Sequence, residues 1–121
     1  MTIRILAVDD SRTMRDMVTL ALKDQGFDVT TAEDGVDGLD ALDRMEPHAI
    51  ITDINMPRLD GFGFIDAVRS RETTSSTPIL VLTTESSAEL KARAREAGAT
   101  GWIVKPFAPD KLIQALRMVT G

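Results

Sequence analysis

A fivefold alternation of strand-like and helix-like segments constrains the fold of this sequence more than any other feature. Four short apolar runs rich in Ile, Leu and Val occupy residues 3–8, 49–52, 78–83 and 101–104. Such runs are typical of strands that are covered on both faces, as in a parallel sheet. Residues 27–31 instead alternate apolar and polar side chains, which indicates an edge strand.

Helical patterns lie between these strands. In the first of them, apolar residues recur at the spacing of one buried helix face: Met14, Met17, Val18, Ala21 and Leu22. Shorter patterns predict helices over residues 36–42 and 64–68. A capping-box pattern at residues 86–89 begins the fourth helix and Gly98 ends it. Pro109 suits the first position of the fifth helix.

Regular alternation of strand and helix predicts an α/β fold in which five parallel strands form a doubly wound (βα)5 sheet. The connections are expected to be right-handed, with helices on both faces of the sheet. Ligands of such folds bind beyond the carboxyl ends of the strands. The loops that follow the strands are therefore the place to look for a functional site.

Composition limits the partners and the compartment. The chain has 121 residues, the size of one domain, so we expect a single domain over residues 1–121 with no output domain. A net charge of −5 argues against nucleic acid and membrane surfaces as partners. The chain has no cysteine, no signal-peptide core and no apolar run of roughly 20 residues. We expect a cytoplasmic monomer.

The loops after the strands hold an unusual set of side chains. Asp9 and Asp10 follow the first strand, Asp53 the third, Thr83 the fourth and Lys105 the fifth. Each alone has an ordinary explanation: a helix cap, a turn residue, a strand-end hydroxyl or a solvated surface lysine. Together they would gather at one edge of one sheet, whereas chance would scatter them over both edges.

Three neighbouring carboxylates repel one another, so their negative charge needs to be balanced by cations. Two unit charges about 5 Å apart repel by roughly 3 kcal/mol at an effective dielectric of about 20. Lys105 offsets only part of this repulsion, and Mg²⁺, a hard cation with oxygen ligands, would offset the rest. One carboxylate could then act as a nucleophile while metal, lysine and hydroxyl neutralise the oxygens of a transferred phosphoryl group.

Four segments, AVDDSRTMR, TDINMPRLDGFGFI, VLTTES and GWIVKPF, resemble the receiver domains of bacterial two-component response regulators. The resemblance covers the whole chain and is closest to the single-domain chemotaxis regulators of the CheY type. It implies the flavodoxin-like strand order 2-1-3-4-5, which the spacing of the segments does not give.

The resemblance implies a role for each residue of the acidic site. Asp53 would accept a phosphoryl group from a histidine kinase. Asp10 and Asp53 would coordinate Mg²⁺ together with the backbone carbonyl of Asn55, and Asp9 would hold a metal-bound water. These residues are thus an expected metal site and phosphorylation site.

The resemblance also implies the residues that act on the phosphoryl group. Lys105 would pair with Asp53 and then with the phosphoryl group, to which Thr83 would donate a hydrogen bond. Three residues have expected structural roles: Pro57 and Gly61 in the loop after the phosphoacceptor, and Pro106 in a cis peptide bond.

The expected output surface comprises the fourth helix, the fifth strand and the fifth helix. It would include Lys111 and Trp102, which stands where relatives more often have tyrosine or phenylalanine and rotate that ring on activation. The larger indole could hinder this rotation, and Trp102 could instead only pack between the last two helices. Asn55 and Glu85 would tune the lifetime of the acyl phosphate.

The resulting hypothesis is a phosphoacceptor that catalyses its own phosphorylation and slow dephosphorylation, rather than an enzyme. Its expected target is a protein such as a flagellar motor switch protein. The alternatives are a phosphate sink for a chemotaxis kinase and a stand-alone receiver with a non-motor partner. A flavodoxin is disfavoured because Asp9 and Asp10 would repel a flavin phosphate. A haloacid-dehalogenase phosphatase would need a second acid where Asn55 stands.

Overall fold

Five parallel strands form one sheet in the order β2-β1-β3-β4-β5 in the computed structural model, which describes residues 2–121. The strands are β1 (Arg4–Val8), β2 (Asp28–Ala32), β3 (Ala49–Thr52), β4 (Ile79–Thr83) and β5 (Gly101–Val104). The strand order implied by the resemblance is confirmed, and so is the edge position of the second strand.

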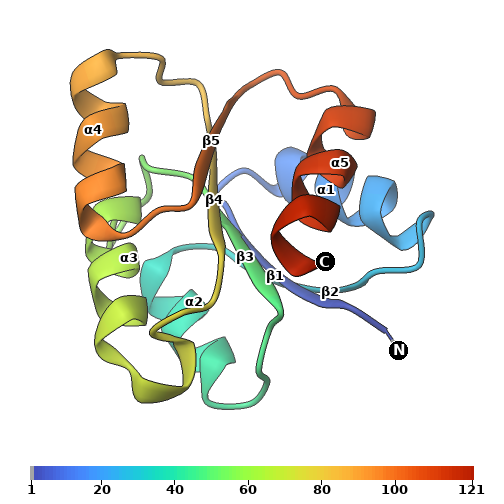
Figure 1. Ribbon diagram of the computed structural model, residues 1–121, viewed down its shortest axis with the longest axis horizontal. Coiled ribbons are helices and arrows are strands. Elements are labelled where there is room, and N and C mark those ends of the chain that lie inside the picture. Colours follow the sequence, from blue (N-terminus) through green and yellow to red (C-terminus); the bar gives the residue numbers. More distant parts are fainter. Residues whose placement is uncertain (1) are drawn as a thin grey trace.

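Helices cover both faces of the sheet (Figure 1). They are α1 (Arg12–Lys23), α2 (Gly35–Leu42), α3 (Gly61–Ser70), α4 (Ala88–Ala97) and α5 (Pro109–Thr120), with a 3₁₀ turn, η1, at Glu72–Thr74. The α1 and α5 helices pack on one face, and α2, α3 and α4 on the other. The doubly wound fold predicted from the alternation is therefore confirmed.

The hydrophobic core has two parts, one on each face of the sheet. Alternate residues of β1 belong to different parts: Leu6 faces the α2–α3–α4 layer and Ile5 faces the α1–α5 layer. The β3 and β4 strands are buried along their whole length. The fifth strand lies at the edge that the strand order gives it, but it is less buried than its apolar run predicts, because none of its residues is fully buried and Val104 is exposed.

The first helix begins at a side-chain cap. The Ser11 hydroxyl accepts a hydrogen bond of 3.2 Å from the backbone N–H of Met14, so Ser11, and not Asp10, is the N-cap residue of α1. Val18 and Leu22 are buried as the apolar spacing predicts, but Met17 is 48% exposed. The prediction for Met17 is wrong because the buried stripe of α1 is narrower than its apolar pattern.

The ends of the last two helices follow their sequence signals with one shift. The cap of α4 is Ser87, whose hydroxyl accepts from the N–H of Leu90 at 3.1 Å, one residue later than the capping-box pattern suggests. Gly98 ends α4 with a left-handed φ of 115°, a conformation that glycine adopts without steric cost. Pro109 is the first residue of α5, as predicted.

No helix within residues 2–121 has both the length and the apolar character needed to span a bilayer.

Two leucines of α1 offer a matched test of the packing. Leu22 is fully buried, whereas Leu20 is 74% exposed. We expect Leu22→Ala to lower the free energy of unfolding by about 3 kcal/mol, because it leaves a cavity in the core. Leu20→Ala should change it by less than about 0.5 kcal/mol. Urea unfolding of both variants measures the difference, and equal losses would contradict this orientation of α1.

Candidate functional site

Backbone pairing brings the predicted site residues together. The N–H groups of Asp9 and Asp53 donate to carbonyls of β2 and β1, each at 3.0 Å, and that of Lys105 donates to Thr83 at 2.7 Å. The backbone hydrogen bonds of the sheet therefore continue past the ends of the strands, so these residues all lie at the carboxyl ends of the strands. This is the edge of the sheet at which α/β folds bind ligands.

The Lys105 ammonium lies between two carboxylates. Its Nζ is 2.7 Å from Asp9 Oδ2 and 2.8 Å from Asp53 Oδ2. The three side chains are only 8 to 10% exposed, so Lys105 is not a solvated surface charge. Charge-assisted hydrogen bonds in such a shielded position are stronger than those between neutral groups.

Burial and pairing shift the pKa values of two of these groups. Burial raises the pKa of the Asp9 carboxyl, and its hydrogen bonds to Lys105 and to the N–H of Ser11 offset only part of that rise. Burial by itself would lower the pKa of Lys105, but its hydrogen bonds to Asp53 and Asp9 outweigh this effect and raise the pKa. Lys105 therefore stays protonated at neutral pH.

A third carboxylate makes the site strongly anionic. One carboxylate oxygen from each of Asp9, Asp10 and Asp53 lies within 4.8 Å of the other two, and Asp10 is exposed. We call these three residues the acidic cluster. With Lys105 as the neighbouring cation, an excess of two negative charges remains. Oxygen ligands gathered with that excess fit a hard divalent cation such as Mg²⁺.

The loop after β3 fixes the Asp53 carboxylate. The N–H of Ile54 donates to Asp53 Oδ1 at 2.6 Å, while Lys105 occupies the other oxygen. The N–H of Gly61 donates to the Ile54 carbonyl at 2.8 Å and closes the base of the loop. A Cβ atom on Gly61 would lie 2.3 Å from the Asp53 carbonyl oxygen, so this close approach requires glycine.

Glu85 joins the two sides of the site. The Asn55 side-chain amide donates to Glu85 Oε1 at 3.0 Å, and the Trp102 indole N–H donates to the Glu85 carbonyl at 3.0 Å. The hydroxyl of the fully buried Thr83 accepts from the Glu85 N–H at 3.4 Å. The structure thus connects Asn55 of the loop after β3, Glu85 of the loop after β4 and Trp102 of β5, which the sequence places in separate segments.

The remaining predicted residues take varied positions. Trp102 is half-buried and packs against the core on the α4 side, rather than between the last two helices. The bond between Lys105 and Pro106 is cis, as expected. Pro57 lies at the tip of the loop after β3, where its carbonyl accepts from the N–H of Leu59, and Lys111 is exposed on α5.

Sequence reasoning missed three residues near this edge. Arg15 of α1 donates to the Asp9 carbonyl at 2.8 Å. Arg58, in the loop after β3, makes an ion pair of 2.7 Å with Asp34, which is buried. One available signal was that Asp34 follows the second strand, so the topology places it at the same sheet edge.

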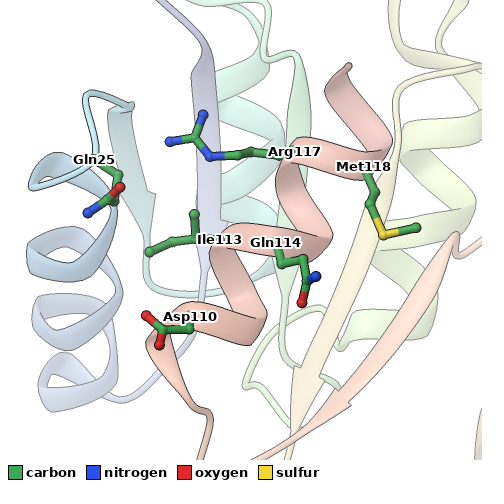
Figure 2. A pocket seen from close by; sticks show the side chains of 6 residues that line it. All are labelled: Gln25, Asp110, Ile113, Gln114, Arg117 and Met118. Carbon is green, nitrogen blue, oxygen red and sulfur yellow. The ribbon is translucent and has the colours of Figure 1, made fainter.

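A large surface hollow lies away from this edge. It has a volume of about 620 Å³ and is lined by Gln25, Asp110, Ile113, Gln114, Arg117 and Met118. Figure 2 shows these side chains along α5 and at the end of α1. No member of the acidic cluster lines this hollow. The candidate site is therefore at the carboxyl ends of the strands, and not in the hollow.

Known proteins are similar to this chain in sequence and in fold. The family described as "Response regulator receiver domain" matches residues 5–117. A probable chemotaxis protein CheY of Rhizobium etli is 37% identical over 98% of this chain and 93% of its own length. The response regulator MprA of a Mycobacterium species is 39% identical over 97% of this chain, which spans only 50% of that relative.

A solved structure of chemotaxis protein CheY4 from Vibrio cholerae superposes with a TM-score of 0.95. It is 45% identical in sequence, and the alignment covers 98% of this chain and 99% of that one. Similarity in sequence and fold therefore extends over nearly the whole chain.

The electrostatics predict the effect of neutralising Asp9. In the absence of divalent cations, Asp9→Asn should raise the melting temperature at pH 7, because it removes a carboxylate whose burial opposes ionisation more strongly than its hydrogen bonds to Lys105 and to the N–H of Ser11 favour it. The gain should shrink as the pH falls through the raised pKa of Asp9 towards 3.8, its ordinary value, because wild-type Asp9 then becomes neutral too. Thermal unfolding in EDTA across this range measures the effect, and an unchanged or lower melting temperature at pH 7 would contradict it.

Proposed function

The chain belongs to the response regulator receiver domain family, and from that premise we propose that Asp53 is its phosphoacceptor. The donor is the phosphohistidine of a histidine kinase. A carboxylate oxygen of Asp53 attacks phosphorus, so an O–P bond forms as the P–N bond of the donor breaks. The product is an acyl phosphate that switches a protein-binding surface.

One observation carries this proposal: Lys105 is held at hydrogen-bond distance from both Asp9 and Asp53. Phosphoryl transfer depends mainly on positioning and on stabilising the charge that spreads over the phosphoryl oxygens. A protonated lysine already beside the nucleophile supplies such a charge without rearrangement. Lys105 then forms an ion pair with the transferred phosphoryl group, and the Thr83 hydroxyl donates a hydrogen bond to the same group.

The acidic cluster supports a metal site at the same place. We assign Asp10, Asp53 and the backbone carbonyl of Asn55 as Mg²⁺ ligands, with Asp9 holding a metal-bound water. When bound, Mg²⁺ would neutralise phosphoryl oxygens as well as the excess charge of the cluster. These assignments account for three carboxylates that a domain of this size would otherwise hold together at a cost in stability.

Hydrolysis and output are assigned to the neighbouring loops. Asn55 and Glu85, joined by a hydrogen bond of 3.0 Å, control the access of water to the acyl phosphate. Trp102, bound to the backbone of Glu85, is part of the output surface with Lys111 and α4. Movement of the β4–α4 loop on phosphorylation would alter the contact between Glu85 and Trp102.

The proposed setting is chemotaxis, with a flagellar motor switch protein as the target. Support comes from the chemotaxis proteins of Rhizobium etli and Vibrio cholerae, which this chain matches over nearly their full length. A single receiver domain without an output domain is part of the proposal. The cysteine-free sequence fits a reducing compartment such as the cytoplasm. The alternatives are a phosphate sink and a receiver with a non-motor partner.

Phosphorylation of Asp53 can be tested directly. With Mg²⁺ and acetyl phosphate, the intact mass of the protein should rise by one phosphoryl group. Asp53→Asn should abolish this gain, because an amide oxygen is a poor nucleophile. Asp66→Asn, which changes an exposed carboxylate of α3, should leave the gain intact. Undiminished labelling of Asp53→Asn would refute the assignment.

The target can be tested with a phosphate mimic. Beryllofluoride should increase the affinity of the protein for a purified flagellar motor switch protein about tenfold, a usual size for coupling between two sites. Asp53→Asn should show no such increase. Wild-type protein that binds no switch protein in either state would exclude a motor regulator and leave the phosphate sink and the receiver with a non-motor partner.

A further inference from the structure

The loop that follows Asp53 contains one strained backbone position. Within residues 2–121, Arg58 is the one residue other than glycine with a positive φ, 63°. The N–H of Leu59 donates to the Pro57 carbonyl at 2.7 Å, so Arg58 is the central residue of a tight γ-turn. This turn is rare and strained for a residue with a side chain, and it persists only where its surroundings hold it.

The Arg58 side chain is held by a carboxylate from another loop. Its Nε donates to Asp34 Oδ2 at 2.7 Å and its Nη2 donates to Asp34 Oδ1 at 3.0 Å. Such a two-pronged contact fixes direction as well as distance. The Asp34 side chain is only 4% exposed, and it also caps α2 by accepting from the N–H of Asp37 at 2.9 Å. The anchor is therefore rigid.

Backbone contacts reinforce this connection. The N–H of Gly35 donates to the Leu59 carbonyl at 3.1 Å. A Cβ atom on Gly35 would lie 2.6 Å from the same oxygen, so the loop before α2 and the tip of the loop after β3 approach as closely as glycine permits. The turn at Arg58 is thus held twice by the loop before α2, through the Arg58 side chain and through the Leu59 carbonyl.

Besides the bond between the Gly35 N–H and the Leu59 carbonyl, the segment 54–60 is attached at its base, on one flank and at its tip. Gly61 closes its base by bonding to Ile54, Glu85 binds the Asn55 side chain on one flank, and Asp34 holds Arg58 at the tip. Asn55 lies in the chain between the base and the tip. Its backbone carbonyl therefore lies in a stretch of chain that is held at both ends.

We propose that the Asp34–Arg58 ion pair positions the loop after β3 and, through it, the Asn55 carbonyl for binding Mg²⁺ beside Asp53. This inference rests on the proposed function, in which that carbonyl is a metal ligand. Arg58 and Asp34 are positioning residues that touch neither the metal nor the phosphoryl group. Their effect is on the affinity for Mg²⁺, because contacts outside the set of ligands commonly change the affinity for a metal.

Titration with Mg²⁺ alone, followed by calorimetry, tests the proposal. Arg58→Ala removes the pair, and Asp34→Asn removes the charge while keeping an oxygen to cap α2. Each should weaken Mg²⁺ binding about tenfold. The double variant should bind no more weakly than either single variant, because both substitutions break the same contact. Arg58→Lys should restore only part of the affinity, since lysine cannot make the two-pronged contact.

A second ion pair provides a matched control. Arg71 Nη2 is 2.6 Å from Asp43 Oδ1, and this pair joins the other ends of α3 and α2, at the far end of the sheet. Arg71→Ala should leave Mg²⁺ affinity unchanged. A loss equal to that of Arg58→Ala would overturn the proposal, because any weakened contact between these helices would then suffice.

Arg58→Gly separates backbone freedom from the ion pair. Glycine adopts a positive φ without strain but cannot reach Asp34. We expect it to lose affinity as Arg58→Ala does, and wild-type affinity in this variant would overturn the proposal.

Circular dichroism establishes that each variant is folded, and if Arg58→Ala is not, Asp34→Asn decides. Unchanged affinity in folded Arg58→Ala or Asp34→Asn would overturn the positioning role alone. The proposed function is tested separately: it fails if the wild-type protein does not accept a phosphoryl group, or if Asp53→Asn accepts one equally well.

Discussion

The ion pairs of Lys105 with Asp9 and Asp53 are the contact around which this edge of the molecule is organised. They join residues of the first, third and fifth strand ends, which are separated by up to 96 positions in sequence. A single ammonium cannot neutralise three carboxylates, so the site keeps an excess of negative charge. That excess makes the edge both costly for folding and suited to a divalent cation.

The sheet holds these charged groups in place despite their mutual repulsion. Its three central strands are buried on both faces, and their ladder continues into the loops through the N–H groups of Asp9, Asp53 and Lys105. The backbones of these residues are thereby fixed by the ladder, while the ion pairs and the N–H groups of Ser11 and Ile54 orient their side chains. A rigid frame of this kind lets a polar site remain ordered while its charges repel.

The loops around the site are held by a few side-chain hydrogen bonds, and these bonds join residues that have different proposed roles. Glu85 bonds to Asn55 beside the acidic cluster and to Trp102 on the output surface. Arg58 bonds to Asp34 and holds a turn that would otherwise relax. Under the proposed function, Glu85 links the phosphorylated site to Trp102, because it bonds to both Asn55 and Trp102.

The sequence by itself determined the order of the elements, the parallel sheet and the presence of Asp9, Asp53, Thr83 and Lys105 at one edge, since hydrophobic periodicity and strand ends are local properties. It misplaced Met17, which lies just outside the buried stripe of α1. Only the tertiary structure decided that Lys105 bridges two carboxylates, that Glu85 links Asn55 to Trp102, and that Arg58 is paired with Asp34. Those contacts join residues that are distant in the chain, and their partners depend on how loops of different strands fold towards each other, which no local pattern encodes.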